Sequence, residues 1–167
     1  HGVAWEFGHT CVDPDGPPCR CGRSGCVEAF AGNISIVREA RQLATEGLWN
    51  SVLKNPELIT FTDVLEELNT ANPALEAIYR RAGEVLGTGI FNLVMLLDPE
   101  RVIITGKGVQ AGEALLKPMF ETIDKLKKGM FGFTHTKIMV HTWTDEDWAR
   151  ESGTLVLREI YKSPFFK

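Results

Sequence analysis

The sequence lacks any apolar run approaching the ~18 residues that a membrane-spanning helix needs. It also lacks an excess of basic residues, since 18 Lys and Arg stand against 22 Asp and Glu, for a net charge of -4. This balance argues against a DNA or membrane footprint on this chain itself, because both require a basic surface. We find no internal repeat, no low-complexity tract and no signal peptide. We therefore expect a soluble cytoplasmic protein without a membrane partner.

The length and composition predict one ordinary domain over residues 1–167. Apolar residues make up 44% of the 167 residues, which is enough for a packed core, and charged residues make up 24%. The opening residues have no initiator Met and read like the middle of a longer sequence. We expect the chain to be the C-terminal part of a longer protein.

Periodicity and capping residues predict an α/β fold. Helices are expected wherever apolar residues recur every three or four positions behind a cap such as Thr60 or the Asn72-Pro73 pair. Short β-branched runs indicate parallel strands between them. The expected helices span about 26–47, 60–69, 72–97, a stretch around 115–123, and 144–161 behind a Thr144 cap, and the expected strands span about 101–106 and 137–141.

The same patterns predict which faces are buried. The second half of the 72–97 helix is apolar almost all round, so it should be buried on most sides. The strand at 101–106 reads as a buried one. In the last helix the expected buried face consists of Ala149, Gly153, Val156, Leu157 and Ile160.

All four cysteines fall within residues 11–26, in a polar loop rich in Pro and Gly. Disulfides inside so short a loop would connect nothing distant, so a metal site in a reducing compartment is the better interpretation. One imidazole and three thiolates complete a tetrahedral zinc site with no open position, which makes the metal structural. The predicted ligands are His9, Cys19, Cys21 and Cys26, and Cys11 is left as a passive or partly buried thiol.

The residues around this loop resemble the signature of the ROK family, which contains sugar-responsive bacterial repressors and sugar kinases. The family pattern is Glu-x-Gly-His followed by Cys-x-Cys-Gly-x-x-Gly-Cys-x-Glu, and residues 6–9 and 19–28 match it at every defined position. The weaker segments 92–99 and 102–106 extend the likeness, but only to the C-terminal half of a family member. The resemblance implies the C-terminal lobe of an actin-like (ribonuclease H-like) ATPase fold with a zinc-stapled loop.

The resemblance also implies a sugar site. Carried over, Glu6, His9 and Glu28 would contact sugar hydroxyls in the cleft between two lobes. Carboxylates accept charge-assisted hydrogen bonds from hydroxyls, and a histidine with one nitrogen on a metal keeps its other nitrogen for a ligand. His9 would then belong to both the metal site and the sugar site.

Two branches of the family remain open. The residues around Cys19 and the C-terminal residues 148–165 resemble the repressor branch, which predicts the effector-binding and oligomerisation part of a regulator. DNA would then be bound only through an N-terminal domain outside this chain, and a homodimer or homotetramer is expected. The alternative is the C-terminal half of an ATP- and Mg²⁺-dependent sugar kinase, although Lys107 separates Gly106 and Gly108 where adjacent glycines are expected. A third possibility is a zinc-stapled interaction module without a small ligand.

Overall fold

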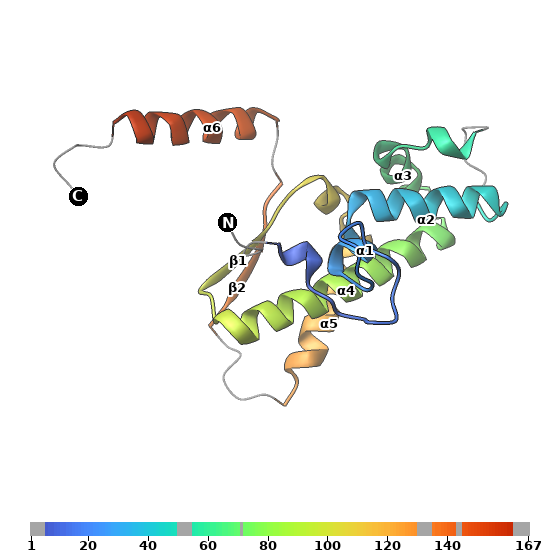
Figure 1. The fold of residues 1–167 in the computed structure, drawn as a ribbon, viewed down its shortest axis with the longest axis horizontal. Helices are drawn as coiled ribbons and strands as arrows, with labels where there is room; N and C mark the ends of the chain where they lie inside the picture. Colours follow the sequence, from blue (N-terminus) through green and yellow to red (C-terminus); the bar gives the residue numbers. More distant parts are fainter. Residues whose placement is uncertain (1–5, 50–54, 71, 130–134, 143–144, 162–167) are drawn as a thin grey trace.

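A single long helix, α4, organises the fold of this computed structural model, which describes residues 6–49, 55–70, 72–129, 135–142 and 145–161 (Figure 1). The metal-ligand loop and α1 lie along α4 together with α2, and α5 packs against it. In chain order the elements are η1 (Phe7–His9), α1 (Val27–Ala31), α2 (Asn33–Thr45), η2 (Pro56–Leu58), α3 (Phe61–Leu68), α4 (Pro73–Leu97), β1 (Arg101–Ile104), η3 (Lys107–Ala111), α5 (Glu113–Lys127), β2 (Lys137–Val140) and α6 (Asp145–Ile160).

The ends of α4 follow from its sequence. The Asn72 side chain accepts hydrogen bonds from the backbone N–H groups of Ala74 and Leu75, and Pro73 occupies the first helical position. At the other end, Asp98 adopts a left-handed conformation (φ 41°) that turns the chain out of the helix. The predicted helix bounds are confirmed.

The sheet of the described residues consists of two parallel strands. Residues Arg101 to Ile104 pair in register with Lys137 to Val140, and α5 forms the crossover between them. One face of the sheet packs on α4 and α5 through Val102, Ile104 and Ile138. The alternation of helices with parallel strands confirms the predicted α/β class.

Glycines allow α4 to approach its neighbours closely. A Cβ atom at Gly83 would lie 2.4 Å from the Leu115 carbonyl oxygen, and one at Gly87 would lie 2.5 Å from the Met119 carbonyl oxygen. About half a turn around the same helix, a Cβ at Gly89 would lie 2.8 Å from Val27 Cγ2 and 3.0 Å from Phe7 Cζ. These contacts place α5 and the metal-loop region directly against the backbone of α4.

A capping box begins α3, as its sequence predicts. The backbone N–H of Thr60 donates to Asp63 Oδ2 at 2.7 Å, and the Asp63 N–H donates to Thr60 Oγ1 at 3.4 Å. Hydrogen bonds from the hydroxyl and then the backbone N–H of Thr60 lower the pKa of Asp63. The carboxylate is therefore the form that stabilises this cap.

We expect Asp63→Asn to lower the free energy of unfolding at neutral pH by about 1 kcal/mol, as loss of a cap does. Because the folded pKa of Asp63 lies below its unfolded value of about 3.9, the contribution is complete above that pH and is lost as pH falls through the folded pKa. Urea unfolding at pH 7 and at a series of pH values below about 4 measures it, and the difference between the two proteins should shrink as the pH falls. Thr62→Ala, at an exposed position one residue away, is the control. Its free energy of unfolding should equal that of the native protein at every pH tested.

The prediction of a single helix over about 26–47 is wrong, because the structure has two helices there, α1 and α2. Gly32 adopts an extended conformation (φ −70°, ψ 143°) and separates the two. A Cβ at Gly32 would lie 2.7 Å from the Glu28 carbonyl oxygen, which already accepts hydrogen bonds from Gly32 N–H and Ser35 Oγ. The break changes the direction of the chain directly after the residues that carry the candidate site.

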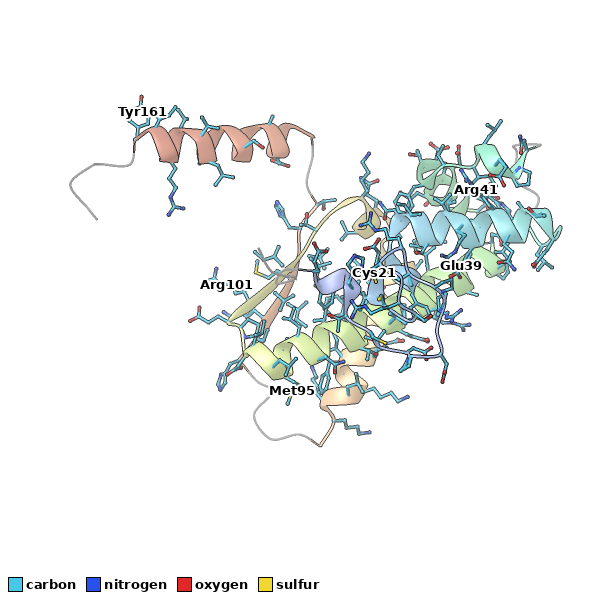
Figure 2. All side chains as sticks on the ribbon, viewed as in Figure 1. Cys21, Glu39, Arg41, Met95, Arg101 and Tyr161 are labelled. Atoms are coloured by element: carbon cyan, nitrogen blue, oxygen red, sulfur yellow. The ribbon has the colours of Figure 1, made fainter. Side chains whose placement is uncertain are left out.

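Several predicted burials are also wrong. Leu96 at the end of α4 is 82% exposed and Ile103 in β1 is 59% exposed, because within the described residues only one side of the helix end and one face of the sheet are covered. The predicted buried face of α6 is exposed because this helix stands apart from the rest of the chain, with Tyr161 at its far end (Figure 2). The predicted Thr144 cap lies outside the described residues. The exposed face comprises Ala149, Gly153, Val156, Leu157 and Ile160.

No helix in the described part of the chain combines the length and the apolar character that crossing a membrane would need.

Candidate metal centre

The loop that carries the cysteines is shaped by close backbone contacts. Val12 N–H donates to the Gly25 carbonyl oxygen at 2.9 Å, and Cys19 N–H donates to the Arg23 carbonyl oxygen at 2.7 Å. Gly25 has a φ of +66°, and a Cβ there would lie 1.4 Å from the Asp13 carbonyl oxygen, so only glycine fits. These constraints fold residues 9–26 back on themselves with little apolar material inside.

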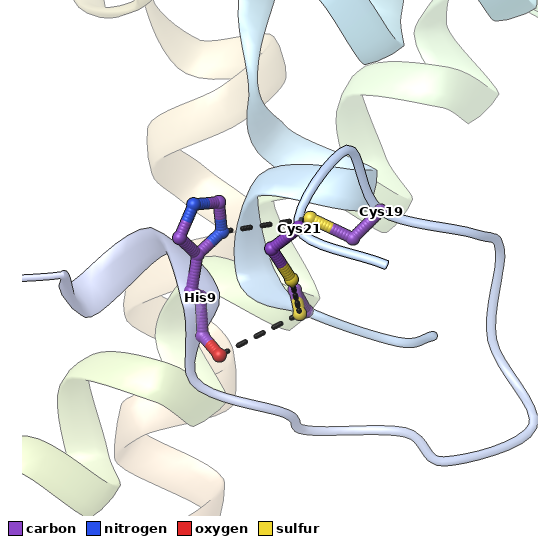
Figure 3. Close-up of side chains that lie close together, drawn as sticks. His9, Cys19 and Cys21 are labelled. Atoms are coloured by element: carbon purple, nitrogen blue, oxygen red, sulfur yellow. Dashed lines mark hydrogen bonds between the residues drawn. The ribbon is translucent and has the colours of Figure 1, made fainter. Parts of the chain in front are cut away.

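The structure brings the four predicted metal ligands together. The ligand atoms of His9, Cys19, Cys21 and Cys26 all lie within 4.8 Å of one another. In Figure 3 the ring of His9 faces the Cys19 sulfur. His9 Nδ1 lies 3.5 Å from that sulfur, and the sulfurs of Cys21 and Cys26 lie 3.7 Å apart. A tetrahedral zinc ion would place two thiolates about 3.8 Å apart and a thiolate and an imidazole nitrogen about 3.5 Å apart. The donor set and its spacing fit one metal ion.

Arg23 and burial shift the pKa values of two cluster thiols in opposite directions. Hydrogen bonds from its backbone N–H and then from its guanidinium lower the pKa of Cys21 to about 6. Burial raises the pKa of Cys26 to about 12. The guanidinium also donates to the His9 carbonyl oxygen at 2.7 Å, which ties the two ends of the loop together. Arg23 therefore favours the thiolate form at Cys21, and thiolates are what metals bind.

Cys11 is not a member of the cluster. Its side chain is exposed, so the predicted alternative of a partly buried thiol is wrong, while the alternative of a passive thiol stays a prediction. Its sulfur donates to the Ser24 carbonyl oxygen at 3.5 Å, and its backbone lies opposite Cys26 in an antiparallel bridge.

His9 lies between the cluster and the two predicted sugar-binding carboxylates. Its Nδ1 faces both Cys19 and Glu28, whose Oε2 is 3.5 Å away, and its Nε2 points toward Glu6 Oε2 at 3.9 Å. Glu28 extends from the first turn of α1 and is 24% exposed, whereas Glu6 precedes η1 and is 61% exposed. Both carboxylates that the resemblance assigns to a sugar site therefore lie within 3.9 Å of the His9 ring.

A cavity of about 370 Å³ opens on the Glu28 side of this arrangement. Gly32 and Asn33 line it from the break between α1 and α2, and Lys107 lines it from the turn after β1. Glu6 instead faces a neighbouring hollow against α4, so the two carboxylates do not line one cavity within the described residues.

Sequence reasoning missed Arg20. Its guanidinium pairs with both carboxylate oxygens of Glu28 through Nε and NH2. Arg20 occupies the variable position of the Cys-x-Cys pattern, so the pattern itself gave no signal. Arginine commonly pairs with carboxylates, so its position between Cys19 and Cys21 was the one available signal that a carboxylate lies nearby.

Solved structures define the class of this fold. A ROK family glucokinase from Streptomyces griseus in complex with glucose and AMPPNP matches with a TM-score of 0.67 at 30% identity, over 83% of this chain and 46% of that one. A ROK family transcriptional regulator, a homologue of the Escherichia coli MLC protein, matches with a TM-score of 0.70 at 25% identity, over 88% of this chain and 37% of that one. The chain has the actin-like ATPase fold of these proteins.

The model of the ROK family matches residues 1–157, and this chain belongs to the ROK family. The glucokinase of Halalkalibacterium halodurans is 32% identical over 71% of this chain and 37% of its own length. The xylose repressor of Caldicellulosiruptor bescii is 29% identical over 98% of this chain and 41% of its own length. The chain thus spans about two fifths of the length of these relatives, which include both regulators and kinases.

Proposed function

We propose that the chain is the effector-binding part of a sugar-responsive ROK transcriptional regulator with a structural zinc ion at His9, Cys19, Cys21 and Cys26. The observation that carries this proposal is the position of His9, whose two ring nitrogens face the cysteine cluster and Glu6. A zinc ion on Nδ1 would fix the ring and leave Nε2 for a sugar hydroxyl. The zinc ion would stabilise the loop, and the loop would position His9 for contact with the sugar.

The regulator assignment is supported by how far the relatives align. The xylose repressor aligns over 98% of the chain, through α6, whereas the glucokinase aligns over 71%. In such a regulator, a sugar with different affinities for two arrangements of the protein shifts their populations. DNA would be bound by a domain outside this chain, and the whole protein would act as a cytoplasmic homodimer or homotetramer.

The alternative is the C-terminal half of an ATP- and Mg²⁺-dependent sugar kinase. It is supported by the 32% identity to a glucokinase and by the cavity that joins Glu28 to the glycine-containing turn after β1. Adding ATP, Mg²⁺ and D-glucose or D-xylose to the full-length protein separates the two functions. Sugar binding without ADP production supports the regulator, and turnover with either sugar overturns it.

We expect Glu28→Gln in the full-length protein to weaken the binding of the effector sugar by about 10²-fold. A hydrogen bond to a charged acceptor contributes about 1.5–3 kcal/mol, and the amide replaces one acceptor oxygen with a donor. Calorimetry with D-glucose and D-xylose measures the affinity, and elemental analysis should find the zinc content unchanged.

Glu84→Gln, at an exposed position on α4, is the matched control and should bind as the native protein does. Unchanged affinity in Glu28→Gln would exclude this carboxylate from the sugar site. If neither sugar binds the native protein while zinc is retained, the simple interaction module is the better description.

A further inference from the structure

Cys11 and Cys26 lie directly opposite each other in the antiparallel bridge of the metal loop. The flanking hydrogen bonds run from Val12 N–H to the Gly25 carbonyl oxygen and from Val27 N–H to the Thr10 carbonyl oxygen. This pattern identifies a non-hydrogen-bonded antiparallel pair, in which the two Cα atoms lie about 4.5 Å apart. Disulfides span Cα separations of about 4.4–6.8 Å, so the backbone already has the spacing for one.

Each of the two sulfurs lies against a backbone carbonyl oxygen of the opposite strand. Cys11 Sγ lies 3.5 Å from the Ser24 carbonyl oxygen, two residues before Cys26, and Cys26 Sγ lies 3.5 Å from the His9 carbonyl oxygen, two residues before Cys11. Because opposed residues of an antiparallel pair project to the same face, rotation of the two side chains brings the sulfurs together. No movement of the backbone is needed.

The two thiols differ in access. Cys26 is fully buried at 0% exposure, whereas Cys11 is exposed and takes no part in the four-residue cluster. Of these two thiols, Cys11 is therefore the one that an oxidant in solvent can reach, and Cys26 lies on the inner side of the pair, where it can attack the oxidised Cys11 sulfur.

We propose that Cys11 is an oxidation site whose sulfur forms a disulfide with Cys26 and thereby removes one ligand from the metal. The inference rests on the metal site of the proposed function. The oxidant is a peroxide, and sugar binding is not part of the step.

The chemistry balances with hydrogen peroxide as the oxidant. The Cys11 thiolate attacks one peroxide oxygen, the O–O bond breaks, hydroxide leaves, and Cys11 becomes a sulfenic acid. The Cys26 thiolate then attacks the Cys11 sulfur, the S–S bond forms as the S–O bond breaks, and a second hydroxide leaves. The two sulfurs together lose two electrons. One hydroxide takes up the proton that Cys11 loses on ionising, and the other takes a proton from solvent, because a metal-bound Cys26 carries no thiol proton; two molecules of water result. His9, Cys19 and Cys21 remain as an incomplete ligand set.

The experiment follows metal release from reduced, zinc-loaded protein treated with hydrogen peroxide. A chromogenic chelator records the zinc, and peptide mapping by mass spectrometry identifies the disulfide. The native protein should release its zinc and yield a Cys11–Cys26 disulfide, and a thiol reductant with added zinc should reverse both. Cys11→Ser should bind zinc equally well and release it at least about tenfold more slowly, because it lacks the neighbouring intramolecular partner.

Thr10→Ala, an exposed position in the same segment, is the matched control and should release zinc at the native rate. Equal release rates in Cys11→Ser and the native protein, or a disulfide between Cys21 and Cys26 alone, would overturn the proposal. Failure of the metal site itself is distinguishable, because the protein would then contain no zinc before any peroxide is added.

Discussion

Cys26→Ser should abolish stoichiometric zinc binding and leave residues 9–26 without a fixed structure. Cys26 is fully buried and directly precedes α1, so its thiolate would link the metal to the helical body. The loop has little apolar content of its own, and a metal that binds only the folded state stabilises it by about 4 kcal/mol when the free ion is at about a thousand times Kd. Elemental analysis, thermal unfolding and limited proteolysis of the loop measure the three consequences.

Cys11→Ser is the matched control for this experiment, because it removes an exposed thiol from the same loop without touching the cluster. It should retain one zinc ion per chain and the native unfolding temperature. A Cys26→Ser protein that still carries one zinc ion per chain would show that the four residues do not form the metal site.

Replacing Gly83 and Gly87 together by alanine should destabilise the protein by about 2–4 kcal/mol. Each added Cβ would lie 2.4–2.5 Å from a carbonyl oxygen of α5, so the two helices must separate. Overpacking costs about 1–3 kcal/mol per site, and clashes with backbone atoms fall in the upper part of this range, at about 2–3 kcal/mol. Subtracting the gain of about 1 kcal/mol from replacing a helical glycine leaves a loss of about 1–2 kcal/mol per site. Chemical unfolding measures the change.

Gly153→Ala provides the comparison, since a Cβ at Gly153 in α6 would meet nothing within 4 Å. The same substitution there should leave stability unchanged or raise it by no more than about 1 kcal/mol. A double variant at positions 83 and 87 as stable as the native protein would contradict the close packing of α4 on α5.

Local signals in the sequence predicted most elements, because caps act within a few residues. The Asn72-Pro73 start of α4 and the Thr60–Asp63 capping box were visible as residue types at fixed spacings. The clustering of His9 with three cysteines was predictable for the same reason, since a metal constrains ligand number and type.

The failed predictions depend on tertiary context. Periodicity shows that Leu157 belongs to an apolar face, but whether anything covers that face depends on elements elsewhere, and here nothing described does. The break at Gly32 follows from the contacts that the Glu28 carbonyl oxygen makes, which no local pattern reports. The pairing of Arg20 with Glu28 likewise joins residues eight positions apart across a loop whose shape the sequence did not reveal.

The glycines of α4 have a mechanical consequence. Phe7 and Val27 pack against Gly89 on one side of the helix, and α5 packs against Gly83 and Gly87 on the other. At both contacts the neighbours therefore touch the backbone of α4 directly, with no α4 side chain between them. Where side chains separate two packed helices, changes of rotamer accommodate small shifts between them. Glycine has no side chain, so α4 offers few such adjustments at these contacts. Any displacement of Phe7 or Val27 toward Gly89 would therefore require α4 itself to move, and α5 would have to move with it.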